Sequence, residues 1–582
     1  MKKFPATLLC SCVFLLTGAF GKEDIKEKSE VRSLAGEVPG GAMAFFETQG
    51  LADLVAHIHS SELFMSLLES EDFEKLKANG FFKDVAFARR MIEFTLRMSI
   101  WEVSERLLGG RFGLAAYPAG EGKEPDLLLL IKPSRPSDWL RNRMRFAPLI
   151  RLGLKRINRL EFAKQAHVYR TRWDKDEATF FGINEDWIVV TTDKELLQET
   201  IALQFHNDEA GALPKTLASE TAFKGMNARM GEDHLARAFL DTRRLIEVTG
   251  DNLGIPEEIS DPVLGLFLGG VVELVGHGEF AGFTLDYSEK KLHFRAGIDA
   301  GPEDVSEEYR LFFSGGDGVG VGLPPRVPGY IGGASLYRSF GEWYRKREDA
   351  VRVALIPGVE SFDGNVGDLL MGHADGGEGL LGNNVMFLSA HADDAGVDGN
   401  GIQLPGFAFV VDLANPDDAD MALARLFRAA LVDLEKNNDL PGNAWLDGTE
   451  TRQGTRITYA SRQVGEGEVQ MIPASARYKN WFIVSSSRQL CRGIIDELSS
   501  GGVTVLKDED LALDLRFDEL SRFFAANQRQ YEAELVRSGR SEEQARVDYQ
   551  NIEKFLKGMK FLRCTSSASS GKFEFSLQGE FK

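Results

Sequence analysis

The sequence predicts an α+β fold built from two tandem homologous repeats, each a mainly antiparallel sheet with helices packed on one face. Three observations lead to this prediction. Several segments recur in the same order in the two halves of the chain, short apolar stretches tend to come in adjacent pairs, and helical stretches separate the pairs. A parallel, doubly wound sheet is less well supported, because no glycine-rich turn of the nucleotide-binding kind follows a strand.

The chain opens with a predicted signal peptide over residues 1–21. Lys2 and Lys3 form a basic start, an apolar run extends to Phe20, and Ala19 and Gly21 are small residues before a cleavage site. The run is slightly short for a membrane span, which needs roughly 20 apolar residues. The chain is therefore expected to be exported.

Two alternatives to a cleaved signal peptide remain open. The segment could stay as an uncleaved N-terminal anchor, or the chain could be a lipoprotein attached through Cys12. Residues 22–36, which follow, are predicted to be a polar leader.

An internal duplication organises the rest of the chain. Residues 185–197 match residues 479–491 without a gap, with Trp187 aligned to Trp481. Each copy is predicted to be a turn, a buried strand and then a helix that begins with a capping box at Thr192 or Ser486. The match predicts the same local fold in both halves.

Other matches follow in the same order. They pair residues 107–114 with 380–387, 126–133 with 406–413, and the alternating strand 292–296 with 573–577. These matches place repeat 1 at residues 37–299 and repeat 2 at residues 328–582, and they leave a Gly/Pro-rich linker at residues 300–327.

The repeats resemble an uncharacterised family of exported bacterial proteins, known only as a domain of unknown function. The resemblance rests on the opening Val38–Glu47, the strand Leu108–Leu114 and the strand–helix unit Trp187–Ile201. Gly40 and Gly41 depart from the alanine and aspartate that are frequent in that family. The resemblance implies export and a duplicated α+β architecture, and it brings no catalytic residue with it.

Composition and motifs exclude several function classes. The net charge of −20 argues against nucleic acid as a partner. The sequence contains no metal-ligand motif, nucleophile elbow, Walker loop or dinucleotide fingerprint, so no metal, cofactor or catalytic residue is assigned. The carboxylates at strand ends are interpreted as helix caps or first-turn acids rather than acid–base pairs: Glu47, Asp241, Asp412 and Asp518. Whether the chain is an enzyme stays open, with a non-enzyme favoured.

One basic segment opposes the acidic balance of the chain. The stretch from Trp139 to Leu160 is predicted to be a basic amphipathic helix, kinked or split near Pro148. Such a helix could contact an anionic membrane or polymer, although arginines paired with the protein's own acids would look the same. The candidate contact residues are Arg141, Arg145, Lys155, Arg156 and Arg159.

Two cysteines, Cys491 and Cys564, remain after the signal peptide. Export permits a disulfide between them, and two buried free thiols are the equal alternative.

These observations favour a non-catalytic protein of the periplasm or cell envelope that binds or scaffolds an unknown envelope protein or polymer. Two other hypotheses stay open. One is an envelope hydrolase with an unrecognised active site, and the other is a peripheral membrane protein that uses the basic helix. The oligomeric state is not predicted.

Overall fold

A computed structural model divides the chain into two compact units. Unit 1 comprises residues 1–253 and 278–289, and unit 2 comprises residues 254–277 and 290–582. The strand at residues 291–298, which the sequence assigned to repeat 1, therefore belongs to unit 2. The structure describes residues 33–49, 110–119, 125–133, 155–156, 167–172, 178–184, 186–205, 214–249, 270–271, 273–288, 290–314, 320–339, 379–392, 403–416, 423–429, 431–432, 445–462 and 471–582.

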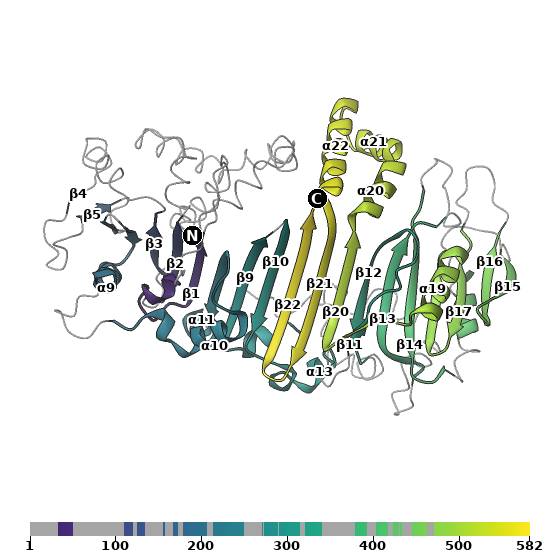
Figure 1. Ribbon diagram of the computed structural model, residues 1–582, viewed down its shortest axis with the longest axis horizontal. Helices are drawn as coiled ribbons and strands as arrows, with labels where there is room; N and C mark the ends of the chain where they lie inside the picture. Colours follow the sequence, from purple (N-terminus) through teal and green to yellow (C-terminus); the bar gives the residue numbers. More distant parts are fainter. Residues whose placement is uncertain are drawn as a thin grey trace. The chain divides into compact units, whose positions relative to one another are not determined.

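Unit 1 is built on an antiparallel sheet whose strands lie in the order β4-β5-β6-β7-β3-β2-β1-β8-β9 (Figure 1). The strands are β1 (Ala44–Gln49), β2 (Arg111–Tyr117), β3 (Asp126–Lys132), β4 (Lys155–Arg156), β5 (His167–Arg172), β6 (Ala178–Ile183), β7 (Ile188–Thr191), β8 (Ala236–Asp241) and β9 (Phe280–Ser288). The described helices are η1 (Leu34–Gly36), α9 (Lys194–Phe205), η3 (Leu217–Ser219), α10 (Thr221–Met230) and α11 (Thr242–Thr249).

The main core of unit 1 lies between one sheet face and the helices α9 and α10. Phe45, Leu130 and Phe239 project from β1, β3 and β8 into the same cluster as Leu197 of α9 and Phe223 of α10. All five side chains are almost fully buried. Because successive strand residues point to opposite faces, every second residue of each strand points into this core.

Unit 2 is also built on an antiparallel sheet, in the order β10-β22-β21-β20-β12-β13-β14-β18-β17-β16-β15. The strands are β10 (Lys291–Ile298), β12 (Tyr330–Tyr337), β13 (Leu381–Ala390), β14 (Gly406–Leu413), β15 (Leu446–Arg452), β16 (Thr455–Ser461), β17 (Ala474–Tyr478), β18 (Trp481–Ser485), β20 (Glu509–Arg516), β21 (Met559–Ser569) and β22 (Lys572–Phe581).

Helices contact both faces of the unit 2 sheet. Helix α19 (Arg488–Ser500) covers one face, where Ile494 and Ile495 pack in a cluster with Met386 of β13 and Val410 of β14. Three consecutive helices follow β20, namely α20 (Phe517–Ala526), α21 (Gln528–Arg537) and α22 (Glu542–Gly558). The first of them, α20, packs against Leu515 of β20 on the other face of the sheet. The prediction of helices combined with antiparallel strands is confirmed. The prediction that helices pack on only one face of the sheet is wrong for unit 2.

The predicted turn–strand–helix units are present as β7 followed by α9 and as β18 followed by α19. Both helices are capped one residue later than predicted. Asp193 accepts hydrogen bonds from the backbone N–H groups of Glu195 and Leu196, and Ser487 accepts one from Leu490. Thr192 and Ser486 instead accept hydrogen bonds from the neighbouring strands β3 and β14, which fixes the strand end against the sheet.

The predicted linker at residues 300–327 contains regular structure. It includes η4 (Pro302–Asp304), α13 (Glu307–Arg310) and β11 (Gly320–Gly322). Strand β11 pairs antiparallel with β19 (Val505–Lys507) in a separate two-stranded sheet of unit 2. A Cβ at Gly320 would lie 1.9 Å from the carbonyl oxygen of Leu506, so glycine here permits close strand contact rather than flexibility.

Candidate functional site

Each sheet carries a row of apolar side chains on the face opposite its α9 or α19 core. Register places these residues side by side across neighbouring strands, and each is at least partly exposed. In unit 1 the row is Phe283, Ala238, Phe46, Leu114, Leu129, Val190 and Phe181. In unit 2 it is Phe294, Leu577, Cys564, Leu513, Ala334, Phe387, Phe409 and Val484. We call these the apolar rows.

Two members of the unit 2 row belong to an exposed cluster of phenylalanines. Phe387 and Phe409 are 38% and 45% exposed, and Phe407, two positions before Phe409 on the same face of β14, is 44% exposed. Antiparallel sheets commonly have a polar outer face, so large exposed apolar groups on such a face indicate contact with something else. The row of unit 1 has one such residue, Phe283, which is 37% exposed.

The residues of the apolar rows offer no charged group. The strands beneath the unit 2 row are hydrogen-bonded to neighbours on both sides, since β13 pairs with β12 and β14, and β14 also pairs with β18. Their backbone N–H and C=O groups are therefore used in the sheet. What remains for a partner at this face is side-chain hydrocarbon and aromatic surface.

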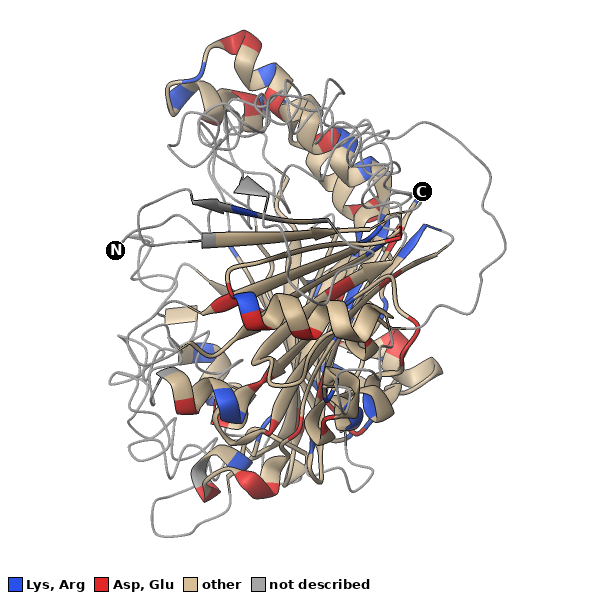
Figure 2. Ribbon diagram, turned by 90° about the vertical axis from the view of Figure 1, so that its left-hand side faces the viewer, with Lys and Arg blue, Asp and Glu red and all other residues tan. Residues whose placement is uncertain are grey.

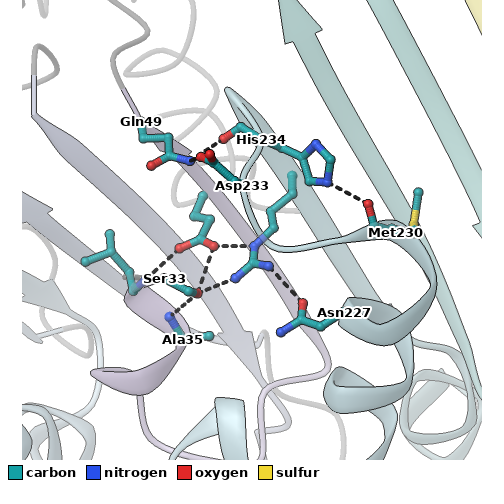
Figure 3. A network of polar contacts seen from close by, with 10 residues as sticks. Ser33, Ala35, Gln49, Asn227, Met230, Asp233 and His234 are labelled. Carbon is teal, nitrogen blue, oxygen red and sulfur yellow. Dashed lines mark hydrogen bonds and ion pairs between the residues drawn. The ribbon is translucent and has the colours of Figure 1, made fainter. Parts of the chain in front are cut away.

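A buried polar network lies in unit 1, on the sheet face opposite the apolar row (Figure 3). The Glu47 carboxylate accepts hydrogen bonds from the Leu34 backbone N–H at 2.7 Å and from the Ser33 hydroxyl at 2.9 Å, and it forms a buried ion pair with Arg237. Arg237 also donates to Ser33 and, at 2.8 Å, to the side-chain oxygen of Asn227. The network fixes residues 33–35 and α10 against β1 and β8.

The neighbouring histidine is held in the same way. His234 Nδ1 lies 2.9 Å from an Asp286 carboxylate oxygen, and Nε2 lies 2.7 Å from the Met230 carbonyl oxygen. Both partners are hydrogen-bond acceptors that lie within the protein. Its ring nitrogens are therefore engaged, and we assign the network a structural role.

Unit 1 also has a surface depression of about 450 Å³ beside α10 and α11. Arg244 in its wall lies 3.3 Å from Glu220 and 3.5 Å from Asp241, and Glu220 accepts a hydrogen bond from the Gly41 backbone at 2.7 Å. Arg243 pairs with Glu279 at 2.6 Å. These charged groups are paired with one another, so they brace the turn at Gly41 rather than converge on a substrate.

The predicted basic helix does not extend over its whole range. Lys155 and Arg156 form β4, which pairs with Tyr169 and Arg170 of β5. The strand pairing replaces the helical hydrogen bonds there, so a continuous helix from residue 139 to 160 is wrong. Arg141, Arg145 and Arg159 lie outside the described residues.

Both cysteines have free thiols. Cys491 is buried in the α19 core with Met386, whereas Cys564 belongs to the apolar row on the opposite face of the sheet. Burial raises the pKa of the Cys491 thiol to about 12 and that of Cys564 to about 11. The two residues do not form the disulfide that the sequence allowed, because the sheet lies between them.

The carboxylates at strand ends have separate structural partners. Asp241 caps α11 by accepting from the Arg244 backbone N–H at 2.8 Å, and Asp412 accepts from the Asn480 side chain at 2.9 Å. Burial raises the pKa of Asp412. Asp518 pairs with Lys582, and Glu47 with Arg237. The prediction of a helix cap or first-turn acid is confirmed for Asp241 and for Asp518, which lies in the first turn of α20.

The apolar rows were not predicted, although the sequence contains a signal for them. Residues 127–131 and 407–411 are continuous apolar runs, and such strands need cover on both faces. The sequence predicts these segments only as matching strands of the two repeats. In the described part of the chain, no helix is both long and apolar enough to span a membrane. Figure 2 shows acidic and basic residues interspersed along the described helices.

Comparisons with known proteins find little. No protein-family model and no curated protein matches the sequence. Among solved structures, crystal form III of TP0453 matches with a TM-score of 0.25 and 9% identity, over 47% of this chain and 81% of that chain. Crystal form IV of TP0453 matches with a TM-score of 0.24, again at 9% identity, over 46% and 79%. Likeness at this level supports no conclusion about fold or function.

Proposed function

We propose that this chain is an exported, non-catalytic protein of the bacterial periplasm or cell envelope that binds the acyl chains of lipids on the apolar row of unit 2. The observation on which the proposal rests is the exposed cluster of Phe387, Phe407 and Phe409 on the unit 2 sheet. Export is supported by the predicted signal peptide at residues 1–21.

The chemistry of the rows favours hydrocarbon over a peptide. A peptide strand would bind at a sheet edge, where backbone hydrogen bonds are free, and the exposed phenylalanines lie on interior strands β13 and β14. Phenylalanine has no polar tip, unlike tyrosine or tryptophan, and so adds no hydrogen bond to a polar partner. Complete burial of such a side chain contributes roughly 1.5–3 kcal/mol, so three of them supply a useful binding free energy.

The size of the unit 2 row also suits an acyl chain. Eight neighbouring strands at about 4.8 Å spacing extend over about 34 Å. The hydrocarbon of one membrane leaflet is about 15 Å thick, half of the bilayer core. An acyl chain lying along the row would therefore be in contact with apolar side chains over its whole length.

A non-catalytic role is supported by the pairing of charged groups in unit 1. Glu47 with Arg237, and Arg244 with Glu220 and Asp241, have partners within the protein. Acid–base catalysis needs groups that are available to a substrate.

We further propose that the two units are copies of one ancestral domain. The strand order β9-β8-β1-β2-β3-β7-β6-β5-β4 in unit 1 parallels β21-β20-β12-β13-β14-β18-β17-β16-β15 in unit 2. The aligned pairs also agree in register, because Leu114 faces Leu129 as Phe387 faces Phe409. Superposition of the units in an experimental structure, with Trp187 on Trp481, tests this proposal; a different strand path in the superposed sheets would refute it.

Lipid binding is tested with the mature full-length protein and a fluorescent fatty acid. We expect saturable binding by the unaltered protein and loss of binding in the triple variant Phe387→Ser, Phe407→Ser, Phe409→Ser. The matched control is Leu446→Ser with Val505→Ser, which removes apolar residues that are 62% and 52% exposed on β15 and β19. The control should bind as the unaltered protein does. Equal binding by the triple variant, with its fold intact by circular dichroism, would refute the proposal.

A further inference from the structure

Three arginines surround one buried aspartate on the face of unit 2 opposite the apolar row. Asp514 of β20 has a side chain that is 3% exposed, and its carboxylate oxygens lie 3.3 Å from Arg326, 3.4 Å from Arg516 and 3.3 Å from Arg563. The arginines come from the segment before β12, from the end of β20 and from β21. Three segments of unit 2 therefore converge on one carboxylate.

The cluster has more positive charge than Asp514 can balance. Three guanidinium groups around one carboxylate leave a surplus of two positive charges. All three N–O distances are longer than the roughly 2.7–2.9 Å of a good charge-assisted hydrogen bond, as expected when one carboxylate is shared among them. Each guanidinium has several N–H donors, and among the described residues Asp514 is the only side chain with which the three arginines form hydrogen bonds or ion pairs.

One of the remaining donors is itself buried. The Nε atom of Arg563 is buried and has no hydrogen-bond partner among the described residues. A buried donor without a partner costs free energy, which makes such a group a reason to look for a missing ligand. The arginines are also accessible, because the side chains of Arg326, Arg516 and Arg563 are 48%, 33% and 33% exposed.

The pKa of the buried Tyr330 hydroxyl, on β12, responds to the same charged groups. Burial raises the pKa of its hydroxyl, Asp514 raises it further, and Arg326, Arg516 and Arg563 lower it. Asp514 and the three arginines are thus the charged groups with the largest effects on the pKa of Tyr330. Beside Arg563, the cross-strand neighbour Gln578 is exposed and uncharged. Among these groups, three positive charges face one negative charge.

We propose that Arg326, Arg516 and Arg563 form a binding site for a phosphate group. A phosphate carries about −1.5 to −2 charges at neutral pH, which matches the surplus. Its tetrahedral arrangement of acceptor oxygens can receive N–H groups from three directions, and guanidinium forks suit phosphate geometry. The site stands apart from the apolar row, because Asp514 and the row residue Leu513 are adjacent in β20 and point to opposite faces.

The phosphate group could belong to a soluble molecule or to a lipid headgroup, and the experiment separates the two. Calorimetric titration of the mature full-length protein uses inorganic phosphate and glycerol 3-phosphate. Flotation uses vesicles of phosphatidylcholine with and without phosphatidylglycerol. Saturable binding in solution without flotation supports a soluble ligand, and flotation only with phosphatidylglycerol supports a headgroup.

The variants decide whether the arginines are responsible. Arg326→Ala with Arg516→Ala should weaken binding at least about tenfold, because two charge-assisted contacts are lost. The control Arg522→Ala with Arg537→Ala removes exposed arginines of α20 and α21 that pair with Glu519 and Glu534, and it should bind normally. Asp514→Asn should tighten binding by removing the competing carboxylate. Absence of saturable binding in both assays, or unchanged affinity in the folded double variant, would overturn the proposal.

Discussion

Phe387 of β13 and Phe409 of β14 face each other directly across two central strands of unit 2, with ring centroids 5.3 Å apart. Both rings lie on the sheet face opposite α19, and both are more than a third exposed. A stable globular sheet does not need such a pair on an outer face. The pair is therefore the most direct sign of a partner.

We expect Phe409→Ala to change the stability of unit 2 little, by about 1 kcal/mol or less, because the ring is already 45% exposed. Phe482→Ala in β18 is the comparison, since that ring is 4% exposed in a core cluster and its loss should cost about 3–5 kcal/mol. Urea unfolding followed by circular dichroism measures both. A large loss for Phe409→Ala would mean that the ring is part of the core and not of a binding surface.

The Glu47–Arg237 pair should be essential to unit 1. Glu47→Ala leaves a buried guanidinium without its counter-charge, and we expect a loss of about 3–5 kcal/mol. Arg243→Ala is the control, because Arg243 and Glu279 are both largely exposed and such pairs contribute about 0–1 kcal/mol. Denaturant midpoints compare the two variants, and equal effects would contradict a buried, energetically important pair.

Glu509 should make unit 2 less stable as the pH rises. Burial, then the nearby Asp510, raises the pKa of Glu509 from 4.5 to about 7, against the lowering effect of a hydrogen bond from Thr565. A carboxyl whose pKa is raised by folding is protonated more readily in the folded state. Its destabilising effect is therefore absent below about pH 4.5, grows from there to about pH 7, and stays constant above.

The variant Glu509→Gln removes this titration. Its stability relative to the unaltered protein should rise between pH 4.5 and 7 and level off above that range. Glu534→Gln is the control, because Glu534 is 71% exposed on α21. Thermal unfolding across pH 4 to 8 measures the difference, and a stability difference that does not vary with pH would contradict the raised pKa.

Both thiols should be present and slow to react in the folded protein. Burial raises the pKa of Cys491 and Cys564, so little thiolate exists at neutral pH. Mature protein prepared without reductant should label slowly with iodoacetamide and acquire two labels after unfolding. Cys491, which is fully buried, should be labelled only on unfolding. Failure of the unfolded protein to label without reductant would show that the cysteines are oxidised.

Local order along the chain was readable from the sequence. Hydroxyl and acidic residues after an apolar strand predicted the start of α9 and α19 to within one residue. The exact cap was missed because two adjacent polar residues compete at each site. Thr192 and Asp193 are both able to cap, and only the position of β3 determines that Thr192 bonds to the neighbouring strand.

The sequence by itself determined the alternation of strands and helices, the apolar character of the strands and the absence of known catalytic motifs, because these depend on neighbours along the chain. Tertiary structure alone decided which face of each strand is covered. Phe409 and Val410 are adjacent and equally apolar, yet Val410 is buried under α19 and Phe409 is exposed. The convergence of Arg326, Arg516 and Arg563 on Asp514 was likewise not readable, since strand pairing brings together residues that are far apart in sequence.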